Sequence, residues 1–246
     1  MNNWVLITGG AQRIGRAVAL HLHQLGYNIA LHYSRSSYDA TAVCDQLNAT
    51  RTNSCRLFHA DLSQAQEIEH LIDQVSQQCP ALKVVINNAS LFTADSSIVG
   101  HSALTRLLSV NLMAPYLIVQ GLKRILTDNQ GCVINLIDIH ADRPLLGHGL
   151  YSMSKAALKM ATYSLAQELG AKVRVNGVSP GAILWPEQAN DAAQEQVLKQ
   201  IPLRRCGTVD DIAHAVNFLI DAHYITGQVI AVDGGRSATG YQGADG

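Results

Sequence analysis

Short apolar runs alternate with amphipathic segments along the whole chain. Seven of these runs have the length and composition of strands, and they cover residues 5–7, 29–33, 55–59, 84–86, 133–137, 173–178 and 229–232. Because the runs are almost continuously apolar, they are typical of strands buried on both faces, and the helical segments between them provide the crossovers that a parallel sheet requires. The pattern predicts an α/β fold with one doubly wound, Rossmann-type domain and a seven-stranded parallel sheet.

The helical segments carry their own start and stop signals. The first amphipathic segment ends at Gly26, a residue typical of helix C-termini. Ser63-x-x-Gln66 has the form of a capping box at the start of a later helix. Two longer helices are expected over 102–123 and 151–169.

No linker, low-complexity tract or repeat divides the chain, so a single domain is predicted over 1–246. The regular alternation breaks late in the sequence, between Pro180 and Pro202. There a polar helical stretch, 187–200, lies within a predicted substrate loop at about 182–201. A loop in this place would cover a binding crevice.

Composition mainly excludes other classes of protein. The 246 residues are 48% hydrophobic and carry 18 basic against 19 acidic side chains, without the basic run typical of nucleic-acid binding. The five cysteines include no CxxC pair and the ten histidines no HExxH motif, so neither a disulfide framework nor a metal site is predicted. No basic leader precedes the first strand and no run of 18 apolar residues follows, so we expect a cytoplasmic protein without a membrane segment.

A glycine-rich turn joins the first strand to the first helix, and it reads Thr8-Gly9-Gly10-Ala11-Gln12-Arg13-Ile14-Gly15. In a sheet of this kind, that connection brings backbone N–H groups to a pyrophosphate at the helix start. Gly9 permits close backbone approach, and Arg13 and Ile14 would open the helix beside the phosphates. We therefore expect a bound dinucleotide. The alternatives are a purely structural turn and, for Arg13, a solvated side chain.

The end of the second strand indicates which dinucleotide is bound. NAD-binding folds carry an acidic residue there for the adenosine ribose hydroxyls. This chain instead has His32-Tyr33-Ser34-Arg35-Ser36, and Asp39 is too far along. The guanidinium and hydroxyls of that stretch suit a 2′-phosphate, so NADPH is the predicted cofactor. Asp61 and Leu62 follow the third strand, where the carboxylate would bind the adenine amino group or would only form a turn.

Tyr151 and Lys155 stand four residues apart at the start of a predicted helix, so both side chains lie on one face. An ammonium beside a phenol stabilises the phenolate, and we expect Lys155 to lower the pKa of Tyr151 from its ordinary value of ~10. A tyrosine tuned in this way transfers protons around neutral pH. The same spacing also occurs on amphipathic surface helices, so it indicates a catalytic pair only when other motifs accompany it.

Several further motifs occur in a fixed order, and with them the sequence resembles the short-chain dehydrogenase/reductase family over essentially its whole length. They are Asn87-Asn88-Ala89, Asn111, Pro180-Gly181 and Asp233-Gly234-Gly235. The resemblance implies that Tyr151 donates the proton, that Lys155 binds the nicotinamide ribose, and that Asn111 supports a water relay. It also implies a homotetramer with the helices at 102–123 and 151–169 packed across subunits. Further cofactor contacts are expected at Asn88, Ala89, Ser90, Pro180 and Gly181.

Two departures from the general family pattern match one subgroup. Arg13 stands where the glycine turn usually has its second glycine, and Asp138 stands thirteen residues before Tyr151, where a serine or threonine normally orients a carbonyl substrate. Both are similar to the pteridine reductases and dihydromonapterin reductases. In that subgroup the arginine contacts cofactor phosphate and the aspartate works with the tyrosine in proton delivery. Ser34 and the stretch 180–183 depart from the subgroup, which leaves the choice of substrate open.

A pterin is a flat, polar heteroaromatic ring, so its site needs a stacking surface and polar groups around the edge. Phe92 would stack the ring against the nicotinamide, and Trp185 would add a second aromatic wall. The groups that would face the ring heteroatoms and the phosphates are Ser90, Arg13, Asp138 and Tyr151. Alternatively, Phe92 packs under the substrate loop, Trp185 anchors that loop, and Asp138 bonds its own turn.

Three functions follow from these residues. The favoured one is NADPH-dependent reduction of a dihydropterin, of the dihydromonapterin, dihydrobiopterin or dihydrofolate type, because a Tyr–Asp couple can deliver the proton that C=N reduction needs. A generic carbonyl reductase, such as a 3-oxoacyl reductase, would share the cofactor residues but would carry a hydroxyl side chain at position 138. A non-catalytic NADPH sensor would typically have lost Tyr151, Lys155 or Asn111, and all three are present.

Overall fold

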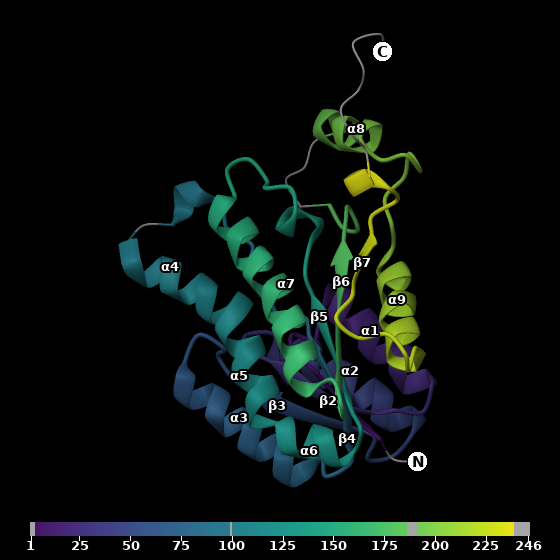
Figure 1. The fold of residues 1–246 in the computed structure, drawn as a ribbon. Helices are drawn as coiled ribbons and strands as arrows, with labels where there is room; N and C mark the ends of the chain where they lie inside the picture. The colour runs from purple at the N-terminus through teal and green to yellow at the C-terminus, as the bar shows by residue number, and fades with distance from the viewer. Residues whose placement is uncertain (1–2, 99, 186–190, 239–246) are drawn as a thin grey trace.

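The computed structural model describes residues 3–98, 100–185 and 191–238. Its strands form one parallel sheet in the order β3-β2-β1-β4-β5-β6-β7 (Figure 1). They are β1 Trp4–Ile7, β2 Asn28–Tyr33, β3 Cys55–His59, β4 Leu82–Asn87, β5 Cys132–Leu136, β6 Arg174–Pro180 and β7 Val229–Val232. The predicted seven-stranded parallel sheet is confirmed, and each strand ends within two residues of its predicted bounds.

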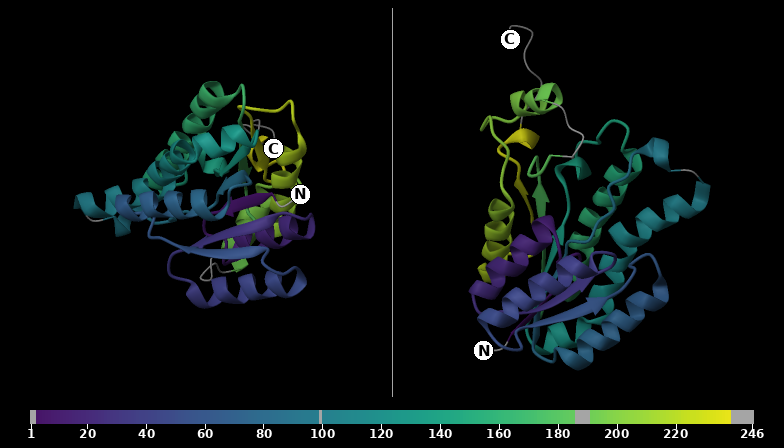
Figure 2. Two further views of the ribbon diagram at one scale, coloured as in Figure 1. Left: turned by 90° about the horizontal axis from the view of Figure 1, so that it is seen from below. Right: turned by 180° about the vertical axis from the view of Figure 1, so that it is seen from behind.

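Helices cover both faces of the sheet (Figures 1 and 2). One layer contains α1 Arg13–Gln24, α2 Ser37–Thr50 and α9 Val209–Asp221. The other contains α3 Ala65–Gln78, α5 Ala114–Gly121, α6 Lys123–Asp128 and α7 Gly149–Leu169. Side chains alternate along each strand, so Val5 and Ile7 of β1 belong to the first core and Trp4 and Leu6 to the second. The doubly wound arrangement is confirmed.

The long helix predicted over 102–123 is interrupted near its middle. α4 Gly100–Leu108 runs into a π-helical turn, Ser109–Met113, which leads into α5. Pro115 has no N–H to donate to the carbonyl of Asn111 four residues earlier, which accounts for the wider turn. The stretch Gly100–Gly121 is long and apolar enough to cross a membrane by length and composition. It packs against α3 and α7 within the domain, however, and its buried apolar side chains, such as Val110 and Ile118, belong to the second core.

The predicted capping box at Ser63-x-x-Gln66 is wrong. α3 begins at Ala65, and the Ser63 hydroxyl donates to the Asp61 carboxylate at 2.8 Å instead of capping the helix. The Ser63 backbone N–H donates to the same oxygen at 2.9 Å, so Asp61 forms an Asx turn that occupies both groups. The helix stop at Gly26 is confirmed, with this glycine in the left-handed region at φ +96°.

The helix α8, Asp191–Lys199, lies beyond the carboxyl ends of β6 and β7 (Figure 1). It is part of the polar helical stretch predicted over 187–200, of which residues 187–190 lie outside the described residues. The predicted substrate loop at about 182–201 is therefore described at 182–185 and 191–201 only. Trp185, at the edge of this gap, is half-buried.

Candidate active site

The strand order reverses between β1 and β4, and doubly wound folds bind ligands at such a point, outside the carboxyl ends of the strands. Here the glycine turn after β1 meets Asn88, which follows β4. The Asn88 side-chain amide donates to the carbonyls of Thr8 and Gly9, each at 2.9 Å. In return, Thr8 Oγ1 accepts from the backbone N–H groups of Asn88 and Ala89 at 2.9 and 3.0 Å. These bonds fix the turn to the neighbouring strand.

The turn leaves little room for side chains at its glycines, and none at Gly15. A Cβ at Gly15 would lie 2.1 Å from the carbonyl oxygen of Gly9, and Gly9 itself has φ +63°. Arg13, where the general pattern has another glycine, occupies the same left-handed region at φ +50°. A non-glycine residue there costs about 1–2 kcal/mol, and such retained strain is common at binding sites. Arg13 is exposed at the start of α1, and Ile14 after it packs half-buried on the first core.

A buried histidine, His32 on β2, supports the turn from its other side. Its Nδ1 accepts the backbone N–H of Gly9 at 3.1 Å, and its Nε2 lies 3.0 Å from the carbonyl oxygen of Ala60. Burial lowers the pKa of His32 to about 4, so the ring is neutral. Since Nδ1 accepts, Nε2 carries the proton and donates it to Ala60.

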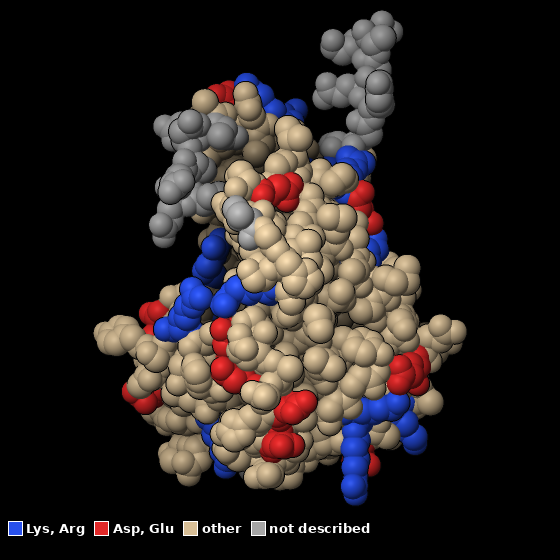
Figure 3. Space-filling view, turned by 90° about the vertical axis from the view of Figure 1, so that its left-hand side faces the viewer, with Lys and Arg blue, Asp and Glu red and all other residues tan. Residues whose placement is uncertain are grey.

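The residues predicted for the cofactor's adenosine end lie between β2 and α2. Tyr33 is half-buried beside the ring of His59, with 5.4 Å between the ring centroids. Arg35 is exposed and has no hydrogen bond or ion pair within the described ranges. Ser36 precedes α2 without capping it through its side chain. Figure 3 shows Lys and Arg side chains gathered beside a hollow on the face that lies on the left in Figure 1.

Asp61 and Leu62, after β3, are already engaged within the protein. Asp61 holds Ser63 through one carboxylate oxygen, and the other lies 3.3 Å from Arg106 Nη2. Burial opposes ionisation, but these hydrogen bonds and the Arg106 charge hold the pKa of Asp61 below its ordinary value. Leu62 is buried in the second core. The turn interpretation of Asp61 accounts for its contacts, and its adenine contact stays a prediction.

Tyr151, the predicted proton donor, lies in the first turn of α7. Its phenol donates to Asp138 Oδ2 at 2.8 Å. Asp138 follows β5 and is partly exposed, and its Oδ1 accepts the backbone N–H of His140 at 2.8 Å. Asp138 therefore does bond its own turn, but its second oxygen is directed to the phenol.

The predicted lowering of the Tyr151 pKa is wrong. Burial, and then the adjacent Asp138 carboxylate, raise the pKa of Tyr151 above its ordinary value. Asp138 contacts the phenol directly, whereas Lys155 Nζ lies 5.8 Å from the ring centroid and donates to the carbonyl of Leu136 at 2.9 Å. Burial, the larger cause, and the nearer negative charge act in the same direction. Tyr151 is thus held as a protonated hydrogen-bond donor.

Lys155 is 2% exposed. Burial lowers its pKa to about 8, against the opposing attraction of Asp138. The protein therefore keeps an ammonium beside the Tyr151 ring although burial of its charge is unfavourable. There it can bind hydroxyl or anionic oxygens of a ligand.

Asn111 lies in the π-helical turn and is fully buried. Its Oδ1 accepts from the backbone N–H of Leu91 at 2.7 Å and from the Ser90 hydroxyl at 3.2 Å. Its Nδ2 donates to the carbonyl of Leu91 at 2.9 Å and to Ser154 Oγ at 3.0 Å. The Ser154 hydroxyl in turn donates to the carbonyl of Tyr151 at 2.6 Å. The side chain thus ties the loop after β4 to α7, and its part in a water relay stays a prediction.

An aromatic wall stands beside the phenol. The Phe92 ring lies edge-on to Tyr151 at 4.8 Å and stacks on His148 at 4.4 Å, with 16° between the two stacked planes. Phe92 is nevertheless 56% exposed, so one side of its ring is open to a ligand. Ser90, on the same loop, is exposed as well.

Asp95 fastens this loop to the start of α7. Its backbone N–H donates to the carbonyl of Gly147 at 2.8 Å. Its carboxylate accepts the backbone N–H groups of Gly149 and Leu150 at 2.8 and 3.2 Å. These two hydrogen bonds lower the pKa of Asp95. The wall that carries Phe92 and the helix that carries Tyr151 are therefore held together.

The remaining predicted residues lie after β6. Pro180 ends this strand, and the backbone N–H of Gly181 donates to the carbonyl of Val232 at 3.0 Å. A Cβ at Gly181 would lie 2.6 Å from that of Asp233, so the two segments meet closely. Within the described ranges, no hydrogen bond or ring contact joins Trp185 or Arg13 to the group around Tyr151.

Comparison with known proteins agrees with this geometry. Residues 9–237 match the family model described as enoyl-(acyl carrier protein) reductase. The chain belongs to the short-chain dehydrogenase/reductase family. This short-chain reductase is 33% identical to pteridine reductase 1 of Leishmania tarentolae, over 95% of this chain and 96% of that protein. It is also 33% identical to the 3-oxoacyl-(acyl-carrier-protein) reductase of Staphylococcus epidermidis, over 96% of this chain and 99% of that protein.

The residues of the short-chain reductase fit a nicotinamide dinucleotide. The glycine turn admits a close backbone approach at the strand reversal. The buried Lys155 ammonium lies at the carboxyl end of β5, at the same edge of the sheet. Ser179, at the carboxyl end of β6, has a buried hydroxyl without a hydrogen-bond partner among the described residues. Buried polar groups are normally satisfied, so this hydroxyl suits a bound group.

From the sequence of the short-chain reductase, Thr8 and His32 were named only as members of motifs, without a role of their own, and Asp95 and His148 were not named. A polar residue within an apolar strand could have singled out His32, since such a residue must find partners. Thr8 stands in the turn motif, but its two N–H contacts depend on β4. Asp95 and His148 lie in loops without periodicity, and only the fold brings them together.

Proposed function

We propose that this short-chain reductase uses NADPH to reduce a dihydropterin, of the dihydromonapterin, dihydrobiopterin or dihydrofolate type, to its tetrahydro form. The observation that carries the proposal is the 2.8 Å hydrogen bond between Tyr151 and Asp138, beside the exposed ring of Phe92. Reduction of a C=N bond requires hydride at carbon and a proton at nitrogen. NADPH supplies the hydride when bound, and the residues of the chain must supply the proton.

The Tyr151–Asp138 couple is suited to that proton transfer. Because the pKa of Tyr151 is raised, the phenol keeps its proton at neutral pH until a substrate nitrogen takes it. Asp138 is partly exposed, so it links the buried phenol to solvent and can pass on a replacement proton. The ammonium of Lys155 stabilises negative charge that develops on the phenol during transfer.

Arg35 supports NADPH as the cofactor. It stands exposed after β2, where a doubly wound fold meets the adenosine ribose, and Ser36 follows it. A guanidinium and a hydroxyl at this point suit a 2′-phosphate, which carries up to two negative charges. Arg13, at the start of α1, would lie beside the pyrophosphate.

A 3-oxoacyl reductase is the second candidate, because the bacterial relative of that name is as similar to this chain as the pteridine reductase is. Its carbonyl substrate would need a hydroxyl side chain near the phenol to orient the oxygen. Asp138 stands in that place and argues for the pterin.

Replacing Asp138 with asparagine tests the proposal. The change keeps the size of the side chain but removes its ability to carry a proton, so kcat for a dihydropterin should fall by about 10²- to 10⁴-fold. The matched control is Asp142→Asn, which removes an exposed carboxylate four residues later that pairs with Lys159 at 2.5 Å. Dihydropterin turnover that survives in Asp138→Asn would show that this carboxylate only holds its turn.

The homotetramer belongs to the same proposal, and exposed apolar side chains on two helices support it. On α5 they include Tyr116 and Leu117, and on α7 they include Met153 and Met160. Contiguous apolar exposure on a folded domain is typical of a subunit interface. Analytical ultracentrifugation should give four times the mass of the chain, and a monomer at micromolar concentration would contradict this assembly.

A further inference from the structure

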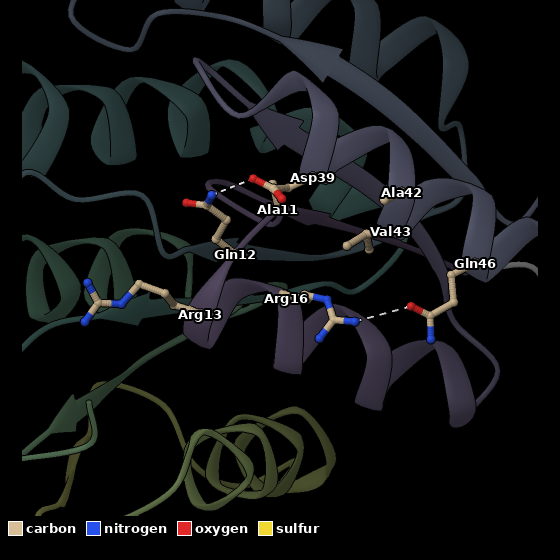
Figure 4. Close-up of a pocket in the computed structure, with 8 residues that line it drawn as sticks. All are labelled: Ala11, Gln12, Arg13, Arg16, Asp39, Ala42, Val43 and Gln46. Atoms are coloured by element: carbon tan, nitrogen blue, oxygen red, sulfur yellow. Dashed lines mark hydrogen bonds between the residues drawn. The ribbon is translucent and has the colours of Figure 1, made fainter. Parts of the chain in front are cut away.

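A hollow of about 340 Å³ lies between α1 and α2, beside the glycine turn. In Figure 4, Gln12 and Asp39 point toward each other at one side of it, and Arg16 points toward Gln46. Gln12 Nε2 donates to Asp39 Oδ2 at 2.6 Å. From the sequence we expected Asp39 to lie too far along the chain to reach the cofactor. The first turn of α2, however, brings its carboxylate into contact with Gln12 of the glycine turn.

Asp39 is therefore hydrogen-bonded to one of the two segments that would hold the adenosine end of the cofactor and closely follows the other in the chain. One is the glycine turn, in which the backbone N–H of Gly10 donates to the carbonyl of His32 at 3.0 Å. The other begins at Arg35, four residues before Asp39. A phosphate that bridged these segments would lie close to the carboxylate.

The charge of Asp39 is not neutralised by a cation within the described part of the chain. Its hydrogen-bond partner, Gln12, is a neutral amide, which orients the carboxylate and leaves its charge in place. Of the two arginines that line the hollow, Arg16 donates to Gln46 at 3.4 Å, and Arg13 points away from Asp39 in Figure 4.

We propose that Asp39 limits the preference of this enzyme for NADPH over NADH. Its carboxylate repels the 2′-phosphate that Arg35 attracts, because a 2′-phosphate carries about −1.5 to −2 charge at neutral pH. The ribose hydroxyls of NADH carry no such charge and are not repelled. Gln12 acts as a positioning residue that holds the carboxylate in place. This inference rests on the proposed use of NADPH.

The test is calorimetric titration of the full chain with 2′,5′-ADP and with 5′-AMP, two probes that differ only in the 2′-phosphate. In Asp39→Asn the side chain keeps its shape and still accepts from Gln12, but it loses the charge. Affinity for 2′,5′-ADP should rise on the order of three- to tenfold, while affinity for 5′-AMP changes by less than about twofold. The gain should shrink as salt is added, because salt screens the repulsion.

Asp45→Asn is the matched control. It removes the same charge from an exposed position six residues farther along α2, about 9 Å away along the helix axis. Both probes should bind this variant as they bind the unmodified chain. If Asp39→Asn matches Asp45→Asn while the unmodified chain still prefers 2′,5′-ADP, the role of Asp39 is refuted and the use of NADPH stands. If the unmodified chain binds both probes equally, the proposed use of NADPH fails, and the inference about Asp39 fails with it.

Discussion

Replacing Lys155 with methionine should stabilise the fold at neutral pH while it abolishes activity. The ammonium is buried, and burial lowers its pKa from 10.5 to about 8. A difference of that size corresponds to ~3 kcal/mol of folding free energy. The methionine also leaves the carbonyl of Leu136 without its donor, which costs about 1 kcal/mol. The net gain at neutral pH is therefore ~2 kcal/mol.

The stability gain of Lys155→Met should depend on pH. A lysine whose folded pKa lies below its unfolded value destabilises the fold most at low pH, and the penalty is relieved as pH rises through about 8. Between about pH 8 and 10.5 the unfolded chain binds more protons, so the contribution of Lys155 to stability increases. The advantage of Lys155→Met should accordingly disappear by about pH 10.

Urea unfolding at a fixed protein concentration measures both effects, and dihydropterin turnover measures the loss of activity. The matched control is Lys159→Met, one turn later on α7, where the ammonium is partly exposed and pairs with Asp142 at 2.5 Å. Loss of that pair should lower stability by up to about 1 kcal/mol. If Lys155→Met were destabilised at neutral pH in the same way and kept the pH profile of the unmodified chain, Lys155 would not be a buried charge of lowered pKa.

Four further changes test the site. Tyr151→Phe should lower kcat by about 10³-fold with NADPH affinity nearly unchanged, and a fully active variant would remove the phenol from the mechanism. Arg35→Ala should weaken NADPH by about tenfold and NADH by much less in fluorescence titrations; equal losses would refute the 2′-phosphate role. Gly15→Ala puts a Cβ 2.1 Å from the Gly9 carbonyl oxygen, so cofactor binding should be lost in the same titration. Asp95→Ala removes the hydrogen bonds that hold the Phe92 loop to α7, so KM for the dihydropterin should rise about tenfold while NADPH affinity is unchanged. An unchanged KM would show that the loop keeps its position without these hydrogen bonds.

The central strands were predictable because both of their faces are buried, whereas the edge strands β3 and β7 are partly exposed. The ends of the strands were less predictable, since polar residues can extend a strand when they find partners. β4 begins at Leu82 and includes Lys83, whose ammonium donates to the carbonyl of Asn129 at 2.5 Å. β6 continues through Pro180, which needs no donor at the end of a strand.

The helix termini depended on which hydrogen-bond partners the capping groups take, and a sequence motif does not show this. Ser63 has the right spacing for a cap, but Asp61 takes its hydroxyl and its N–H first. Pro115 was visible in the sequence, yet a proline can kink, end or widen a helix. Here the helix continues through a π-helical turn that contains Asn111.

The site residues on one helix face, or in ordered motifs, could be named from the sequence, but their electrostatics could not. The pKa of Tyr151 is raised by burial and then by the contact with Asp138, and the four-residue spacing of Tyr151 and Lys155 shows neither. Asp39 was set aside because of its distance along the chain, but the start of α2 returns it to Gln12. Such contacts between loops have no periodic signal.

The central claim is that the Tyr151–Asp138 couple serves a pterin. It is tested most directly by NADPH oxidation with the purified enzyme, followed optically against dihydromonapterin, dihydrobiopterin, dihydrofolate and a 3-oxoacyl thioester. The account predicts turnover of at least one dihydropterin with kcat/KM about 10²-fold or more above that of the thioester. Rapid turnover of the thioester with inert dihydropterins would contradict it and make this chain a carbonyl reductase with an unusual acid at position 138.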